Sequence, residues 1–399
     1  MSFLCDLPWI HLSVMPHGVT SICCEANHKN NKSHAVDQHN NLVPIHNNSV
    51  EDVVNSESYK QIREAMLAGR VPEACKGCHK IEKAGGVSKR LKDSSWKFDW
   101  KSRTAPDGSI TPDIRALEIR LGNLCNLKCR SCNAESSSSW IPEYYKFKDQ
   151  IPLASGYEWI KKKPEFTHAW TEDPDFYEKI LNASPNLENI YISGGEPFLV
   201  PKHFDFIKRL RDSGNTDLHI SYHTNLNYDI EKLRPHLDVL RDFRSVKLNL
   251  SIDDVGERNS YIRNPSNWDL TIKNLDYFHK QTDLEIEICQ TVNVYNFMYI
   301  EELYKLIKDI PIYYNHVHAP AYQSAFVLDL DKRKQKLSEV KNIIPENLYN
   351  GLMQYNEIPS DPETVSLFTR YTKMLDQSRK ENFEQIFPKT ASSLGVANV

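Results

Sequence analysis

Six runs of alternating apolar and polar residues, separated by helical stretches, constrain the fold of this chain more than any other feature. Strands that alternate with helices form parallel sheets whose faces the helices cover. The pattern predicts an α/β fold, a partial (β/α)6 barrel. The expected strands are residues 114–121, 187–193, 217–224, 245–253, 284–292 and 312–318, and the expected helices are 202–212, 229–240, 268–280 and 299–308.

The second face of these strands is polar. In residues 245–253, four aliphatic side chains alternate with Lys247, Asn249, Ser251 and Asp253. A parallel strand packed on both faces is apolar throughout, and an unpaired polar group in a dry core costs several kcal/mol. We therefore expect a polar lumen filled by solvent or ligand. Candidate substrate contacts on this face are Glu118, Arg120, Tyr191, His219, His223 and Asn249.

Composition narrows the class of protein. The 399 residues carry a formal net charge of −4, unlike the basic footprint of a nucleic-acid binder. No apolar run approaches the roughly 18 residues of a membrane span, and the N-terminus lacks a signal-peptide pattern. We expect a cytoplasmic protein with no nucleic-acid or membrane partner. The expected regions are a cysteine-rich domain (1–100), a linker (101–112), the barrel (113–325) and a helical C-terminal extension (326–399).

Three of the nine cysteines stand within eight residues, directly after the first predicted strand: Cys125, Cys129 and Cys132. Close spacing in a cytoplasmic chain indicates metal binding rather than disulfides. A [4Fe–4S] cluster normally takes four cysteines, so a local triad leaves one iron open to another ligand. The loop after a barrel strand is also where barrel active sites are built.

The Cys-x3-Cys-x2-Cys spacing resembles the signature of the radical S-adenosylmethionine (SAM) superfamily, in which the open iron binds the amino and carboxylate groups of SAM. Ser193 to Pro197 (SGGEP) is similar to the GGEP motif of that family. Thr224-Asn225 is similar to its TN(G) turn, although Leu226 replaces the usual Gly.

Two later segments extend the resemblance. SIDD, with an arginine ten residues after its first Asp, is similar to the ribose- and carboxylate-binding segment, although Asp254 stands where many members have Gly. Residues 292–296 (VNVYN) resemble the segment near adenine. Five motifs in family order argue against a closed zinc site at the triad. The cofactor-binding residues that the resemblance implies are Gly194, Gly195, Glu196, Pro197, Asn225, Ser251, Asp253, Arg263 and Asn296.

A second cysteine set lies in the N-terminal region: Cys5, Cys23, Cys75 and Cys78. It resembles the auxiliary-cluster module called SPASM or twitch, which usually follows the barrel and here precedes it. Four cysteines suffice for one cluster, and Cys24 is the alternative to Cys23. A structural zinc site is the alternative for the whole set, since zinc also takes four cysteines.

Cys289 is the remaining isolated cysteine, and its simplest interpretation is a small buried apolar residue. Strand alternation instead places it on the polar lumen face beside Glu285 and Glu287. A lumenal thiol is a candidate donor of a hydrogen atom to a substrate radical.

The resemblance implies an oxidoreductase that holds two [4Fe–4S] clusters and SAM and receives electrons from a donor such as flavodoxin or ferredoxin. Reductive cleavage of SAM would yield a 5′-deoxyadenosyl radical that takes hydrogen from a substrate. We favour a peptide or protein substrate, because family members with such modules modify peptides. The alternatives are a radical dehydrogenase or epimerase of a sugar or aminocyclitol and, outside the class, a zinc-binding scaffold or an iron–sulfur electron carrier.

Overall fold

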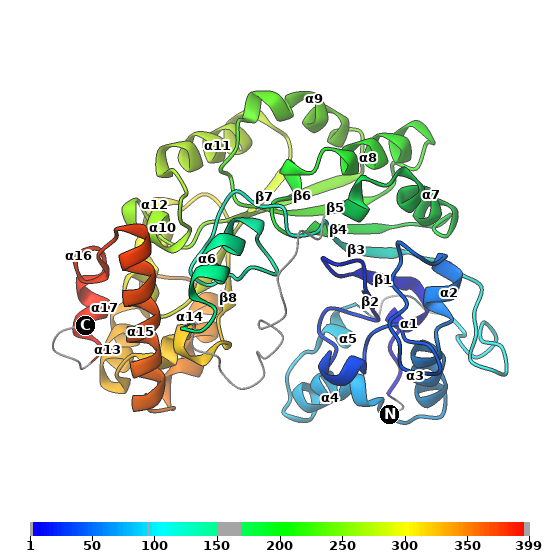
Figure 1. The fold of residues 1–399 in the computed structure, drawn as a ribbon, viewed down its shortest axis with the longest axis horizontal. Helices are drawn as coiled ribbons and strands as arrows, with labels where there is room; N and C mark the ends of the chain where they lie inside the picture. Colours follow the sequence, from blue (N-terminus) through cyan, green and yellow to red (C-terminus); the bar gives the residue numbers. More distant parts are fainter. Residues whose placement is uncertain (1–2, 94–95, 97, 151–168, 395–399) are drawn as a thin grey trace. The chain divides into compact units, whose positions relative to one another are not determined.

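In the computed structural model, residues 3–93, 96, 98–150 and 169–394 are described, and Figure 1 shows the fold. The chain divides into two compact units. Unit 1 comprises Met1–Leu124, Phe166–Tyr222 and Leu233–Val246, and unit 2 comprises Cys125–Glu165, His223–Lys232 and Lys247–Val399.

The described residues form a mostly parallel eight-stranded sheet in the order β2-β1-β3-β4-β5-β6-β7-β8. Strand β2 pairs antiparallel with β1, whereas the pairs β1–β3, β3–β4, β4–β5, β6–β7 and β7–β8 are parallel. The strands are β1 (His11–Val14), β2 (Thr20–Ser21), β3 (Ala116–Arg120), β4 (Asn189–Ser193), β5 (His219–Thr224), β6 (Ser245–Ser251), β7 (Glu285–Val292) and β8 (Ile312–His316).

Strands β3 to β8 coincide with the six predicted runs, each shorter by one to three residues. Along β4 and β5, buried residues alternate with half-buried or exposed ones. The predicted α/β fold is confirmed, and β4 and β5 have the predicted two-faced character.

Strands β1 and β2 were missed from the sequence. All four residues of β1 are buried, so this strand shows no alternation that a periodicity argument could detect. A tight turn joins the two strands, with Met15 N donating to Val19 O at 2.8 Å. Within the turn, Gly18 has φ +76°, and a Cβ there would lie 2.3 Å from Nδ1 of His46.

Strand β1 joins the barrel sheet in parallel with β3, in a register that runs from His11 opposite Ala116 to Val14 opposite Ile119. The N-terminal region and the first barrel strand therefore share one hydrogen-bonded ladder.

The helices of unit 1 begin at residues suited to helix starts. Helix α2 has a capping box, in which Ser49 Oγ accepts from Asp52 N at 3.0 Å and Asp52 Oδ2 accepts from Ser49 N at 3.1 Å. Such reciprocal bonds satisfy donors that the first helical turn leaves free. The helices lying in unit 1 are α1 (Leu7–Ile10), α2 (Val50–Val54), α3 (Glu57–Leu67), α4 (Lys76–Lys83), α5 (Lys89–Lys92), α7 (Pro174–Asn182) and α8 (Lys202–Asp212).

One buried arginine on α3 ties the N-terminal region together. Arg63 is fully buried and donates to the carbonyl oxygens of Pro8 (3.0 Å), Val54 (2.8 Å) and Gly108 (2.8 Å). Gly108 lies in the predicted linker, where the described structure has no helix or strand. This segment is thus held against α3 by a charge-assisted hydrogen bond.

The C-terminal extension is helical, as predicted. Its longest helix, α15 (Pro362–Arg379), begins at Asp361, whose Oδ2 accepts from Thr364 N at 2.9 Å. Phe368, Tyr371 and Leu375 lie on its buried face. None of the described helices combines the length and apolarity that crossing a bilayer requires. The other helices of unit 2 are α6 (Ile141–Phe147), α10 (Glu257–Ile262), α11 (Trp268–Gln281), α12 (Ile300–Leu306), α13 (Leu330–Val340), α14 (Glu346–Leu352), α16 (Phe383–Ile386) and α17 (Pro388–Ser392), and α9 (Ile230–Leu240) spans both units.

Candidate functional site

The cysteine triad occupies a loop of unit 2 that has neither helix nor strand within residues 125–132. Burial, followed by the charges of Cys129 and Cys125, raises the pKa of Cys132, so the three thiols lie close enough to interact electrostatically. Leu127 N donates to Sγ of Cys125 at 3.4 Å. Backbone donors of this kind are among the groups that tune cluster-bound sulfurs.

Side chains that follow the loop hold its carbonyl groups. Ser139 Oγ donates to Cys125 O at 2.7 Å, and Trp140 Nε1 donates to Cys129 O at 2.9 Å. These bonds satisfy backbone acceptors that would be costly to bury alone. The loop conformation is therefore fixed by protein contacts rather than left to a ligand.

The turn after β5 lies beside the first cysteine. Asn225 Nδ2 lies 3.8 Å from Sγ of Cys125 and donates to Oδ1 of Asn126 at 2.9 Å. Leu226 is fully buried and has φ +60°. The position keeps the left-handed backbone that suits Gly, although a leucine side chain occupies it.

Arg263 is the positively charged residue of this site that best suits the binding of an anion. Its NH1 donates to Asp253 Oδ2 at 2.9 Å, and Asp253 Oδ1 accepts from Thr291 N at 2.9 Å. Asp253 is fully buried, and both of its carboxylate oxygens accept hydrogen bonds from protein groups. Arg263 interacts electrostatically with Cys129, and its buried Nε has no hydrogen-bond partner among the described residues.

Asn296 has its amide committed to the backbone. Its Nδ2 donates to Asp253 O at 2.8 Å and to Thr291 O at 2.9 Å, while its Oδ1 accepts from Asn293 N at 2.9 Å. The residue is fully buried. It ties the ends of β6 and β7 together through these contacts.

The two glycines of the SGGEP segment lie in unit 1 against the segment that joins β3 to the cysteine loop. Gly194 has φ +132°, and a Cβ there would lie 2.8 Å from Leu121 N. A Cβ on Gly195 would lie 2.3 Å from Leu124 O. Close approach of the chain's own backbone requires glycine at both positions.

Glu196 and Pro197 follow these glycines. Glu196 is buried, and its Oε1 accepts from Phe198 N at 3.2 Å at the start of η6 (Pro197–Leu199). Its N–H donates to Leu124 O at 2.8 Å.

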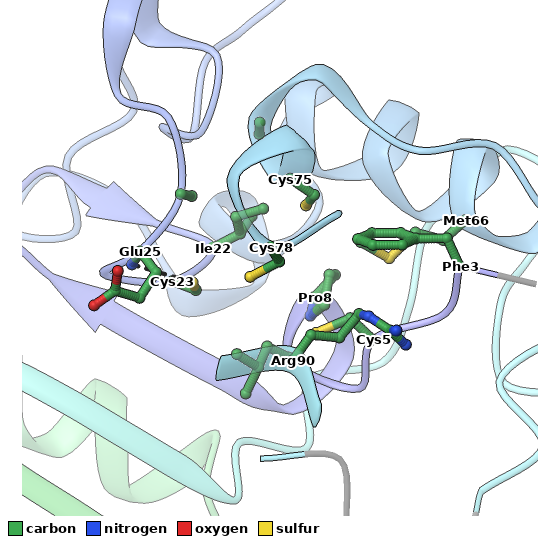
Figure 2. A pocket seen from close by; sticks show the side chains of 13 residues that line it. Phe3, Cys5, Pro8, Ile22, Cys23, Glu25, Met66, Cys75, Cys78 and Arg90 are labelled. Atoms are coloured by element: carbon green, nitrogen blue, oxygen red, sulfur yellow. Dashed lines mark hydrogen bonds between the residues drawn. The ribbon is translucent and has the colours of Figure 1, made fainter. Parts of the chain in front are cut away.

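The second cysteine set lines one pocket of unit 1. Figure 2 shows Cys5 from the segment before α1, Cys23 from the loop after β2, and Cys75 and Cys78 from η2 (Glu73–Cys75) and α4. Burial raises the pKa of Cys5 and of Cys75 to about 12. Iron would bind these thiols despite their raised pKa values, because coordination to a metal deprotonates a thiol.

The pocket distinguishes the two adjacent cysteines. Cys23 lines it and accepts a hydrogen bond from Glu25 N at 3.3 Å. Cys24 is not among the described residues that line this pocket. A hydrogen bond with Cys23 and then burial raise the pKa of the Cys24 thiol, whose charged neighbours are Glu118 and Lys89.

The four thiols line one pocket but do not converge on one point. Among the described residues, no group of three His, Cys, Asp or Glu side chains converges closely enough to hold one metal ion. Zinc bonds of about 2.3 Å would draw four sulfurs to about 4 Å from one another. A cube of iron and sulfide instead fills the space between its ligands.

Residues 119–310 match the family model of the radical SAM superfamily, and residues 5–79 match the SPASM model, an iron–sulfur cluster-binding domain. The chain belongs to the radical SAM superfamily. Its SPASM domain stands at the N-terminus, as predicted. The cofactors of this radical SAM protein are a [4Fe–4S] cluster with SAM and auxiliary iron–sulfur at the SPASM domain.

A comparison with curated proteins found no match. Native anSMEcpe with bound AdoMet is 18% identical, with 62% of this chain and 64% of that chain covered and a TM-score of 0.40. TYW1 with a lysine–pyruvate adduct bound is 16% identical, with 56% and 72% covered and a TM-score of 0.30. The chain thus spans less than two thirds of the anSMEcpe chain.

In unit 2, Cys289 lies on β7 opposite Ser251 of β6. It is 3% exposed. Tyr313 OH lies 3.3 Å from Nε2 of His223. Burial, followed by the charge of Arg263, lowers the pKa of His223 to about 4, so this imidazole is neutral at physiological pH.

The predicted lumen residues of unit 1 lie on neighbouring strands. Glu118 lies 3.7 Å from Nε2 of His11 and 3.6 Å from NH2 of Arg120. Tyr191 stands opposite Glu118 in the β3–β4 register. His219 Nδ1 lies 2.6 Å from Ser245 Oγ. Asn249, in unit 2, is buried opposite Glu287.

Proposed function

We propose that this chain is an enzyme that reductively cleaves SAM and uses the resulting radical to take a hydrogen atom from its substrate. One observation carries the proposal: three mutually close thiols lie beside Arg263, whose buried Nε has no partner among the described residues. Cys125, Cys129 and Cys132 would ligate three irons of a [4Fe–4S] cluster. A cluster held there would supply the electron for reductive cleavage of SAM to methionine and a 5′-deoxyadenosyl radical.

The remaining predicted cofactor-binding residues would bind or position SAM. Arg263 would pair with its carboxylate, a charge-assisted bond, and Asp253 would orient that guanidinium. Ser251 stands at the end of β6. Gly194 to Pro197 would present backbone groups to the methionine amine, and Asn225 would orient the first cysteine.

A pocket of unit 2 is the candidate site for the adenine ring. Cys132 and Asn133 line it together with the aromatic side chains of Trp140, Tyr144 and Tyr322. Aromatic faces stack on planar rings. Since the amide of Asn296 is committed to backbone groups, Asn296 would act by positioning the β6 and β7 ends.

Cys5, Cys23, Cys75 and Cys78 would ligate a second [4Fe–4S] cluster. Four thiolates leave no iron open, which favours electron transfer or a structural role over substrate binding. None of the nine cysteines, all within the described residues, forms a disulfide, which suits a reducing cytoplasm. An acidic donor such as flavodoxin or ferredoxin would supply the electrons.

For the domain boundaries we propose those that the sequence pattern predicts. We keep the cysteine-rich SPASM region at 1–100, the connecting segment at 101–112, the barrel at 113–325 and the helical extension at 326–399.

For the substrate we favour a peptide or protein, because the chain carries a SPASM domain. Hydrogen-bonding side chains on the polar faces of the strands suit a polar chain. The second candidate is an epimerase or dehydrogenase of a small polyol. Cys289 favours epimerisation, because its buried lumenal thiol would return a hydrogen atom.

The test is iron and sulfide per chain after anaerobic reconstitution, followed by an assay for 5′-deoxyadenosine with SAM and dithionite. About eight irons with equal sulfide and 5′-deoxyadenosine that disappears in Cys129→Ala are expected. Zinc without sulfide would overturn the proposal. A peptide library and a polyol panel, scored by substrate-dependent 5′-deoxyadenosine, separate the two substrate classes.

A further inference from the structure

The end of α15 contacts the backbone of the cysteine loop. Arg379 NH2 donates to Lys128 O at 2.9 Å and to Glu143 Oε2 at 2.8 Å. Lys128 Nζ reaches the same carboxylate at 2.6 Å. The Arg379 side chain is 1% exposed, and Lys128 directly precedes Cys129. A residue near the C-terminus thereby holds the loop between its first two cysteines.

A second contact starts from Arg130, which lies between the second and third cysteines. Its NH2 donates to Asp376 Oδ1 at 2.5 Å and to Glu381 Oε2 at 2.6 Å, and its side chain is fully buried. Tyr371 OH, also on α15, donates to Arg130 O at 2.9 Å. Both the side chain and the carbonyl of this loop residue are thus held by the C-terminal extension.

These contacts fix geometry more than they add stability. A buried ion pair is often no more stabilising than apolar packing of similar volume, because desolvating two charges offsets their attraction. A tail that only covered the barrel would need apolar contacts alone. Here charged groups meet carbonyls and charges of the loop at defined points, and both Arg130 and Arg379 are nearly excluded from solvent.

We propose that the C-terminal helices are part of the SAM-cluster site, with Arg379 and the Asp376–Glu381 pair as positioning residues for the cysteine loop. Arg379 holds the loop and places a positive charge beside it. Asp376 and Glu381 hold Arg130 and neutralise its charge. The inference rests on the proposed ligation of a cluster by the triad.

The two sets of charges have opposite effects on a cluster, whose reduction adds an electron. Arg379→Gln removes a positive charge and lowers the midpoint potential. Asp376→Asn combined with Glu381→Gln leaves Arg130 uncompensated and raises the potential. Loosening of the loop alone would shift both variants in the same direction. Arg370→Gln is the matched control, because Arg370 lies exposed on the same helix.

The experiment uses the full chain with both clusters reconstituted and no substrate. An EPR-monitored redox titration follows the signal that changes when SAM is added, and a chelator assay follows iron release. We expect potential shifts of opposite sign, about tenfold faster iron release from the SAM-responsive cluster in Arg379→Gln, and wild-type behaviour in Arg370→Gln.

Shifts of equal sign, wild-type values in both variants, or equal acceleration at the auxiliary cluster would overturn the inference. Circular dichroism checks that each variant folds. If Arg379→Gln does not fold, Arg379→Lys keeps the charge but loses the forked contact, and it should release iron faster at an unchanged potential. A wild-type protein with no SAM-responsive signal would instead overturn the proposed ligation, so the two failures are distinguishable.

Discussion

The side-chain amide of Asn315 on β8 donates a hydrogen bond to Sγ of Cys289 on β7, with 3.0 Å between nitrogen and sulfur. Burial raises the pKa of this thiol to about 11, so it keeps its hydrogen at neutral pH. We predict that Cys289→Ala abolishes return of hydrogen to the substrate radical while 5′-deoxyadenosine is still formed. The measurement is deuterium incorporated into product in D₂O, which should fall to background. Undiminished deuterium in this variant would exclude the thiol as donor.

The two adjacent cysteines of the N-terminal region should behave differently. Cys23→Ser should remove the auxiliary cluster and leave about four irons per chain, whereas Cys24→Ser should keep about eight. The reason is that Cys23 lines the four-thiol pocket and Cys24 does not line it. Iron and sulfide analysis of both variants decides the matter. Loss of iron from Cys24→Ser alone would reverse the assignment.

A methyl group at residue 195 should displace the start of the cysteine loop. In Gly195→Ala the new Cβ would meet Leu124 O at 2.3 Å, and neither is the flexible end of a side chain. We expect destabilisation of about 2 kcal/mol or more, measured by urea unfolding of the cofactor-free chain.

The control for this variant is Gly214→Ala. Gly214 has φ +82°, but no atom lies within 4 Å of the position that a Cβ would take there, so the cost is the backbone strain of about 1 kcal/mol. Equal costs at the two positions would show that the clash at residue 195 is relieved by a small shift of the loop.

Stability near neutral pH should depend on Asp254. Burial raises the pKa of this carboxyl to about 7, although Arg258 opposes the shift. The folded state therefore binds the proton more tightly than the unfolded state, in which the pKa is about 3.9. The contribution of Asp254 is fully present below about pH 4 and is lost as the pH rises to about 7.

The asparagine side chain in Asp254→Asn cannot ionise. The free energy of unfolding of this variant should therefore rise relative to that of the wild type as the pH rises from 5 to 7. The gain is at most about 1.4 kcal/mol per pH unit. Urea unfolding of the cofactor-free chains at several pH values measures it. Two parallel curves would mean that the carboxyl ionises freely in the folded state.

Much of the barrel could be predicted, because its strands alternate in polarity and are punctuated by helices. The predicted helix at residues 202–212 coincides with α8. Strand β1 could not be found this way, since its four residues are all buried and short apolar runs carry no period. Its pairing with β3 joins segments about a hundred residues apart, which no local pattern encodes.

The motifs of the site were visible in the sequence, but the duties of individual side chains were not. Asp253 and Asn296 stand in cofactor-binding motifs, yet their polar groups bond to Arg263 and to backbone atoms. Hydrogen bonds between distant segments depend on tertiary structure. The same reason hid the role of Arg379, whose partner Lys128 lies some 250 residues earlier.

The parallel ladder between β1 and β3 has a mechanical consequence. Cys5 and Cys23 flank a segment that contains β1, and that strand is hydrogen-bonded to β3, which carries Glu118. A hinge motion of the cysteine pocket relative to β3 would have to break these bonds. The separation between the auxiliary site and Glu118 is thus set by strand register. An electron that moved from the auxiliary site toward Glu118 would therefore cross a constant distance. The rate of this transfer would not depend on domain movement.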